Sequence, residues 1–299
     1  VDSPATLDTK SCRHGRFTAV NPQGLSLGFT DETLWLRLTL HNRESSTTLT
    51  YLEVGYPPLD DIRLFWKQDG QWHSDRNGDS VPLHARSLKT RIPAFLLQLQ
   101  PDETRELLLR VRSTSAIAMP VSVASPTVWI QKHERLNIAL GIFYGIGIGL
   151  FFYNLFLWIT IREKTYLYYI VHLGCSLLFY TALQGFAYQW WPNWPDWNTR
   201  SPYVFAYLSM ISGTLFARAF LRTQEWPKAD RLYLAMVFIS LAAAIGLFVL
   251  PARITNPFLG LAAMSNMALL TVTGVMRWRQ GQQEARIFVL AWGMFLISI

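Results

Sequence analysis

The sequence predicts an all-β jelly-roll or β-sandwich domain followed by an all-α, polytopic bundle of transmembrane helices. Residues 1–136 are rich in Asp, Glu, Arg, Ser and Thr, and in several stretches apolar residues recur at every second position. Residues 137–299 are a series of long apolar segments. The whole chain is 51% hydrophobic and only 16% charged, which is less charge than a soluble domain normally has.

We predict a β domain over residues 1–125, a junction over 126–136 and a transmembrane helical domain over 137–299. Ser125-Pro126 suits the start of a helix, with Ser as N-cap and Pro at the first helical position. The junction contains no Gly. We therefore expect a helix to begin near Thr127 and to continue unbroken into the first membrane span.

Short runs of alternating polarity, bounded by turn residues, predict the strands. In Leu34–His41 the leucines form one face, and Trp35, Arg37, Thr39 and His41 form the other. Asp69-Gly70 and Asn77-Gly78 are turn signals. Short strands at this spacing are typical of an antiparallel sandwich. The other predicted strands are Leu49–Val54, Asp61–Trp66, Ala94–Leu99, Glu106–Arg112 and Val121–Ala124.

Four residues of these strands are candidate ligand-binding residues. Trp35 and Arg37 are neighbours on the face opposite the leucines, and Arg110 and Arg112 share one face of their strand. An aromatic ring beside guanidinium groups suits a sugar ring or a carboxylated ligand, through stacking and bidentate hydrogen bonds. The alternative is that Trp35 belongs to the core and that the arginines are solvated strand positions.

The sequence predicts no catalytic residues, no metal ligands and no cofactor, so we expect no enzyme within these residues. Asp60 and Asp61 are adjacent and would point apart in a strand, so they cannot act as a paired acid and base. The net charge of +7 does not indicate nucleic-acid binding, because the basic residues lie between apolar segments. Cys12 and Cys175 should lie in different environments, without a disulfide between them. Metal-ligand spacing is absent among His14, His41, His73 and His84.

Asn137–Thr160 contains no charged side chain and, at ~1.5 Å per residue, can cross the ~30 Å apolar core of a bilayer. Gly141, Gly145 and Gly149 lie on nearly one face of this helix. They predict a packing seam for another helix backbone, with a second copy or another membrane protein as the partner. The further spans are Tyr166–Ala187, Tyr203–Leu221, Leu232–Leu250, Phe258–Val275 and the incomplete segment Ile287–Ile299, beyond which we expect the protein to continue.

The distribution of basic residues predicts the orientation. The first, third and fifth connections contain or flank nine Lys and Arg residues, whereas the second and fourth contain only Arg200 and Arg253. The positive-inside rule then places the odd-numbered connections in the cytoplasm and the β domain outside, which requires an export signal upstream. The second connection, Gln189–Trp197, contains four tryptophans. We interpret it as an interfacial aromatic belt; the alternative is a cap on the β domain.

Several motifs along the chain resemble the bacterial seven-transmembrane receptors with diverse intracellular signalling modules (7TMR-DISM), and the likeness covers nearly the whole chain. In the apolar half they are Tyr144-Gly145, Tyr153-Asn154-Leu155-Phe156-Leu157, Arg162-Glu163-Lys164-Thr165-Tyr166-Leu167-Tyr168-Tyr169 and Gly185-Phe186-Ala187-Tyr188-Gln189-Trp190-Trp191-Pro192. In the polar half, which resembles the family's type 2 extracellular domain, they are Leu34-Trp35-Leu36-Arg37-Leu38-Thr39-Leu40-His41-Asn42, Leu59-Asp60-Asp61-Ile62-Arg63-Leu64, Gly78-Asp79 and Arg110-Val111-Arg112-Ser113.

The resemblance implies a jelly-roll domain similar to carbohydrate-binding modules and seven helices in the inner membrane of a bacterium. It also implies a cytoplasmic output module after the seventh helix, commonly a histidine kinase or a diguanylate cyclase. It favours the Trp35-x-Arg37 pair as a ligand site. This chain departs from the family because it stops in the sixth span, so its output module is unknown.

These observations predict a transmembrane sensory receptor with a periplasmic N-terminal domain. The sandwich would bind a saccharide-like or anionic small ligand, and the helices would relay binding to the output module. One alternative is a regulatory membrane subunit whose sandwich binds a periplasmic partner protein. A transporter is disfavoured because the spans contain no carboxylate, and we expect their polar residues Asn154, Gln184 and Asn266 to bond between helices.

Overall fold

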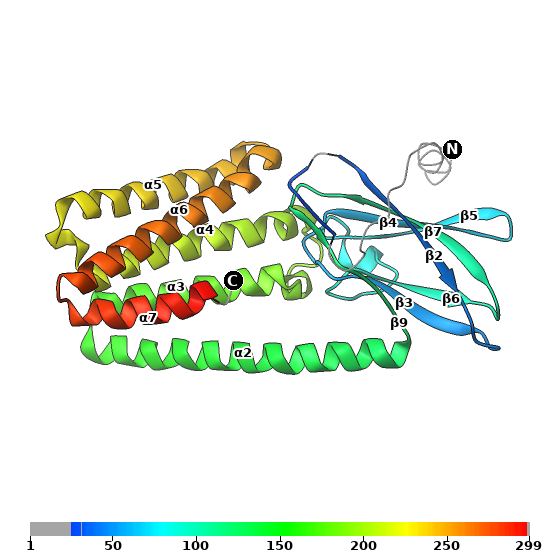
Figure 1. Ribbon diagram of the computed structural model, residues 1–299, viewed down its shortest axis with the longest axis horizontal. Helices are drawn as coiled ribbons and strands as arrows, with labels where there is room; N and C mark the ends of the chain where they lie inside the picture. The colour runs from blue at the N-terminus through cyan, green and yellow to red at the C-terminus, as the bar shows by residue number, and fades with distance from the viewer. Residues whose placement is uncertain (1–24, 31, 298–299) are drawn as a thin grey trace. The chain divides into compact units, whose positions relative to one another are not determined.

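The computed structural model describes residues 25–30 and 32–297 (Figure 1). The chain divides into two compact units, one formed by residues 1–140 and 181–200 and the other by residues 141–180 and 201–299. The predicted domain ranges stay predictions, but this division groups Thr181–Arg200 with the strands. Cys12 lies outside the described residues, and Cys175 is a free thiol.

The first unit is an antiparallel β-sandwich, which confirms the predicted fold class. Its largest sheet has the strand order β2-β7-β4-β5, and a second sheet has the order β6-β3-β9. β1 pairs with β8. The strands are β1 (Leu25–Gly28), β2 (Leu34–His41), β3 (Thr48–Val54), β4 (Asp61–Gln68), β5 (Gln71–Asn77), β6 (Ala94–Leu99), β7 (Thr104–Arg112), β8 (Ile117–Met119) and β9 (Val121–Ala124), with a short 3₁₀ helix η1 (Leu83–Ala85) before β6.

The core lies between the two larger sheets. The leucines of β2 pack there against alternate residues of the other strands, as the period-two pattern predicts. Each fully buried side chain of this size contributes about 1.5–3 kcal/mol to folding. The buried core residues are Leu36, Leu52, Val54, Leu59, Ile62, Leu64, Phe95, Leu97, Leu107, Leu109, Val111, Ile117, Met119 and Val121.

The sequence did not predict β5, the second strand of the hairpin that it forms with β4. Asp69 and Gly70 form its two-residue turn with φ of 51° and 79°, the left-handed geometry that the Asp-Gly signal predicts. β5 follows at once but has few apolar residues, because it is an edge strand with both faces partly exposed. β1 and β8 have only four and three residues and were also not predicted.

The α-helices of the structure overlap the predicted spans but differ from them in their bounds. They are α2 (Pro126–Ile161), α3 (Lys164–Leu183), α4 (Pro195–Phe220), α5 (Pro227–Val249), α6 (Ala252–Arg279) and α7 (Gln283–Ile297), with short 3₁₀ helices η2 (Phe186–Gln189) and η3 (Thr223–Glu225). By length and composition, α2 to α6 can each cross a membrane. α2 begins one residue before the predicted Thr127 and contains all of Asn137–Thr160 in one unbroken helix.

Polar side chains connect the helices of the second unit. Thr214 of α4 donates to the Asn266 amide oxygen of α6 at 2.9 Å, which confirms Asn266 as an interhelical hydrogen bonder. The same prediction is wrong for Asn154, which donates to Leu150 O within its own helix. Arg218, at the end of α4, binds Asp230 of α5 through two hydrogen bonds of 2.7 and 3.0 Å.

The glycines of α2 do not pack as predicted. Apart from the neighbouring backbone of α2 itself, no described atom lies within 4 Å of the position that a Cβ would take at Gly141, Gly145 or Gly149. The close approach to α3 is instead at Gly147, where a Cβ would lie 2.6 Å from a methyl group of Leu177. A seam within the described chain at the three glycines is therefore wrong, and contact with a second chain through them stays a prediction.

Candidate functional site

The open face of the four-stranded sheet brings the predicted site residues together. The strand register pairs Trp35 of β2 with Arg110 of β7, Arg110 with Arg63 of β4, and Arg63 with Arg76 of β5. Because paired strands lie about 4.8 Å apart, these side chains form one row across the sheet. Trp35 and Arg110, predicted from separate strands, are thus direct neighbours.

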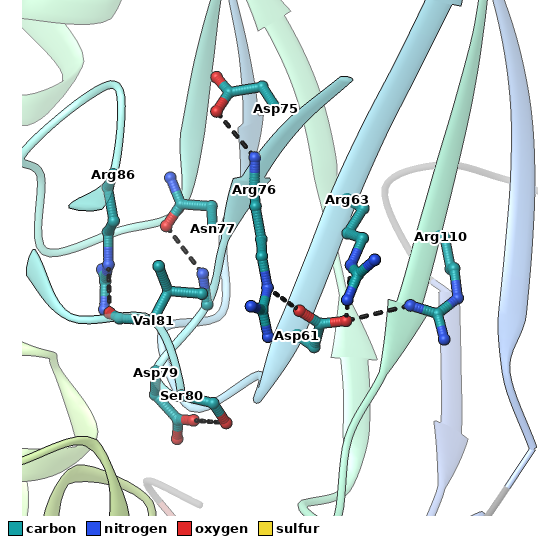
Figure 2. A network of polar contacts seen from close by, with 11 residues as sticks. Asp61, Arg63, Asp75, Arg76, Asn77, Asp79, Ser80, Val81, Arg86 and Arg110 are labelled. Carbon is teal, nitrogen blue, oxygen red and sulfur yellow. Dashed lines mark hydrogen bonds and ion pairs between the residues drawn. The ribbon is translucent and has the colours of Figure 1, made fainter. Parts of the chain in front are cut away.

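The carboxylate of Asp61 holds this row together. Its two oxygens accept from Arg76 Nε at 2.5 Å, Arg110 Nη1 at 3.1 Å and Arg63 Nε at 3.2 Å. Figure 2 shows the three guanidinium groups converging on Asp61 from three strands. Asp61 and Arg110 each have side chains only 16% exposed. The guanidinium groups are therefore held in place, which reduces the conformational entropy that a ligand would have to remove.

A small apolar cluster lies beside the arginine row on the same face. Phe65 and Leu108 are buried there, and the partly buried Trp35 and Trp72 pack against them. The Trp35 ring stacks on Phe65 with 5.8 Å between ring centres. Trp35 is therefore not part of the main core, but it does cover a buried residue. The packing on Phe65 agrees in part with the alternative that Trp35 is a core residue, and its role as a stacking surface for a ligand stays a prediction.

The other two predicted residues lie at the edges of this site. Arg37 is paired with Leu108 in the register and lies 3.8 Å from Glu106, with both side chains more than half exposed. Arg112 is exposed and paired with Asp61. The sequence interpretation missed Asp61, Arg63 and Arg76, because finding them requires knowing that β4 lies between β7 and β5.

A second, buried polar cluster lies where β5 ends. Gly78 has φ of 120°, and a Cβ there would lie 2.3 Å from Asp60 O, so only glycine fits. The chain then places Asp79 inside, 1% exposed. Asp79 Oδ1 accepts from Thr199 Oγ1 at 3.0 Å and from Ser80 Oγ at 3.4 Å, and within the described part of the chain Asp79 forms no ion pair.

Burial raises the pKa of Asp79 well above its usual range, and the nearby Asp60 raises it further, whereas Thr199 and Arg86 act in the opposite direction. Asp60 itself accepts from Ser113 and from the backbone and side chain of Thr114. Burial nevertheless raises the pKa of Asp60 as well. As predicted, the two adjacent carboxylates point apart: Asp60 accepts from Ser113 and Thr114, and Asp61 accepts from the arginines of the open face.

Arg86 is the cation of this cluster and is only 3% exposed. It donates to the carbonyl oxygens of Val81 at 3.1 Å and Thr90 at 3.4 Å, and its guanidinium lies 5.0 Å from the Tyr188 ring centre. Its Nη2 is buried and has no hydrogen-bond partner among the described residues. Figure 2 shows Arg86 bonded to Val81 and the Asp79 carboxylate bonded to Ser80.

The segment Thr181–Arg200, which we call the outer segment, packs on the sandwich. Tyr188 is 2% exposed and donates to Pro57 O at 2.9 Å. Arg91 donates to Gln184 O at 3.1 Å and lies 4.7 Å from the Phe186 ring centre. At Gly185, which has φ of 77°, a Cβ would lie 2.6 Å from Arg91 O.

These contacts come from residues on either side of Gln189–Trp197, so for that connection both the aromatic belt and the cap on the β domain stay predictions. Trp190 and Trp194 are 59% and 68% exposed, so an interfacial position for these two rings stays a prediction.

The start of α2 is attached to the sandwich through Glu53 of β3. The Glu53 carboxylate lies 2.6–2.7 Å from Trp129 Nε1, Lys132 Nζ and His133 Nε2. Burial acts to raise the pKa of Glu53, but the hydrogen bonds from Lys132 and His133 outweigh it and hold the pKa below its usual value. The described residues contain no group of three or more His, Cys, Asp or Glu side chains that could hold a metal ion.

The comparisons with known proteins agree with this architecture. The family model for 7TM diverse intracellular signalling matches residues 136–299, more than half of the chain. The chain belongs to the 7TMR-DISM family. The model for the 7TMR-DISM extracellular 2 domain matches residues 2–125. A comparison with curated proteins found no match. This 7TMR-DISM protein is a multi-pass transmembrane sensory receptor whose N-terminal sandwich lies outside the membrane.

Proposed function

We propose that the sandwich of this receptor binds a saccharide-like or anionic small ligand on the open face of the β2-β7-β4-β5 sheet. The observation that supports this is the set of guanidinium groups fixed around Asp61 beside the Trp35 ring. A guanidinium can bind a carboxylate through two parallel hydrogen bonds, and an indole can stack on a sugar ring. Arg37 and Arg112 would widen the positive face around the bound ligand.

The helix bundle would relay binding across a bacterial inner membrane, with the sandwich in the periplasm. The output module would be a histidine kinase or a diguanylate cyclase. A ligand can shift such an equilibrium only if it binds the two states of the receptor with different affinity. Two attachments of the sandwich support the relay, namely Glu53 with the start of α2 and the contacts of the outer segment.

Isothermal titration of the full chain in lipid nanodiscs with glucuronate, glucose and inorganic phosphate tests this proposal. We expect glucuronate to bind, and Arg110→Lys to weaken it about tenfold, because Lys keeps the charge but loses the two-pronged hydrogen bond. Arg43→Lys changes an exposed arginine in the loop after β2, outside the row of paired residues, and serves as the control. If none of the three probes binds, or if both variants bind glucuronate like the wild type, the proposed site is wrong.

A second candidate is a regulatory membrane subunit whose sandwich binds a periplasmic protein. Leu49 of β3 and Leu96 of β6 support it, because they are diagonal neighbours on the outer face of the other sheet and are 46% and 44% exposed. A photo-crosslinking residue at Leu96 in cells should then capture a periplasmic protein, and the same residue at Gln71 should not. Equal labelling at both positions would count against a partner.

A further inference from the structure

The contact between the outer segment and the sandwich contains one ionisable hydrogen-bond acceptor that is completely buried. Thr199 is at the start of α4, and Asp79 follows β5, yet the Thr199 hydroxyl donates to the Asp79 carboxyl at 3.0 Å. Tyr188 closes the same cluster from η2. We propose that the proton on Asp79 controls how firmly the outer segment is attached to the sandwich, so that the receptor responds to the pH outside the membrane.

The surroundings of Asp79 make this contact sensitive to charge. Among the described residues, Arg86 is the cation that faces Asp79, and it donates to the carbonyl oxygens of Val81 and Thr90 rather than to Asp79. A second carboxyl group, that of Asp60, is close enough to repel an ionised Asp79. The titratable and polar groups around Asp79 are Asp60 before β4, Tyr56 after β3, Ser80, Arg86 after η1, Tyr188 of η2 and Thr199 of α4.

The direction of the pH dependence follows from this arrangement. A protonated Asp79 is neutral, so it can remain buried while Thr199 donates to it. Ionisation leaves a buried negative charge without an ion pair and next to Asp60, which is unfavourable. Since burial raises the pKa of Asp79 in the attached state, attachment is firmest at low pH. The attachment weakens as the pH rises from about 3.9, the ordinary pKa of an aspartate, through the raised pKa of Asp79.

A weaker attachment of the outer segment to the sandwich would act directly on α3 and α4, because the two ends of this segment continue into these helices. Each unit by which the pKa of Asp79 differs between the attached and released states changes the attachment equilibrium about tenfold. This regulation goes beyond ligand binding and does not require it. The guanidinium groups around Asp61 belong to another cluster and take no part in it.

Hydrogen exchange of the full chain in nanodiscs at about pH 5 and about pH 8 tests the proposal, with protection expressed relative to the unstructured exchange rate at each pH. We expect the protection of residues 186–199 to fall about tenfold or more between the two conditions. Asp79→Asn keeps an acceptor for Thr199 but cannot ionise, so its protection should not depend on pH. Asp102→Asn alters an exposed turn carboxylate and should behave like the wild type.

Thr199→Val tests the same proposal independently and can replace Asp79→Asn if that variant does not fold. It removes the donor and leaves Asp79 in place, so protection of residues 186–199 should already be below that of the wild type at about pH 5. Protection should fall further at about pH 8, because the Thr199 hydroxyl also stabilises the ionised carboxylate of Asp79. The proposal is overturned if wild-type protection is the same at both pH values. It is also overturned if Asp79→Asn retains the fall, or if Thr199→Val retains wild-type protection at low pH.

Discussion

Asp61 and Asp79 lie on the same sandwich and have the same side chain, but their environments differ in two respects. Asp61 is on the open face, accepts from three guanidinium groups and keeps 16% of its side chain exposed. Asp79 is 1% exposed, and in the described part of the chain its hydrogen-bond donors are two hydroxyl groups. Cations compensate the first carboxylate, whereas the second is best accommodated as a neutral acid.

The comparison shows that the same carboxylate side chain can serve two different roles, depending on its burial and on whether arginines bind it. On the open face, the charges of Asp61 and its arginines compensate one another and are partly solvated, and this is the face that we propose for an anionic ligand. In the buried cluster, Arg86 and Asp79 are not paired with each other, so the cluster responds to a proton. The following predictions test whether this difference comes from burial.

The largest effect is expected for Arg86→Ala. It removes the bonds to Val81 and Thr90, removes the contact with the Tyr188 ring and leaves a buried void. We expect the free energy of unfolding of the sandwich to fall by about 3 kcal/mol. Thermal unfolding of the full chain, followed by tryptophan fluorescence, measures it. Arg76→Ala is the control, because its guanidinium is 52% exposed. Equal losses for the two variants would show that burial does not distinguish the clusters.

The same substitution should have different effects at the two aspartates. Asp61→Asn removes the shared acceptor of three guanidinium groups and should cost about 1–2 kcal/mol near neutral pH. Asp79→Asn should cost nothing there or raise the unfolding temperature, because a neutral amide replaces an acid whose ionisation is unfavourable in the folded state. Thermal unfolding of both variants in the same buffer tests this. A larger loss for Asp79→Asn would contradict our account of the buried cluster.

The smallest effect is expected for Arg37→Ala. Its ion pair with Glu106 is 3.8 Å long and more than half exposed, so its loss should change the free energy of unfolding by less than about 0.5 kcal/mol. Glucuronate affinity should nevertheless fall if Arg37 contributes to the positive face. Titration and thermal unfolding of the same preparation separate the two effects. An unfolding temperature that falls together with affinity would instead support a structural role for Arg37.

Regular patterns made the strands and helices predictable. The alternation in Leu34–His41 predicts β2 without error, and Ala94–Leu99 and Val121–Ala124 coincide with β6 and β9. β5 could not be found in this way, since an edge strand exposed on both faces has no apolar period. Without β5, Arg76 could not be placed beside Arg63, and the prediction of the site remained at four residues.

The amino-acid sequence alone determined the class of protein, because alternating polarity marks strands with one buried face and long apolar segments mark membrane spans. It also determined the orientation, through the unequal distribution of Lys and Arg. Only the tertiary structure decided which groups meet. Asp61 acquires its arginines through the strand order, and Asp79 meets Thr199 across 120 residues of chain. Such contacts have no local pattern, since they depend on how distant segments pack together.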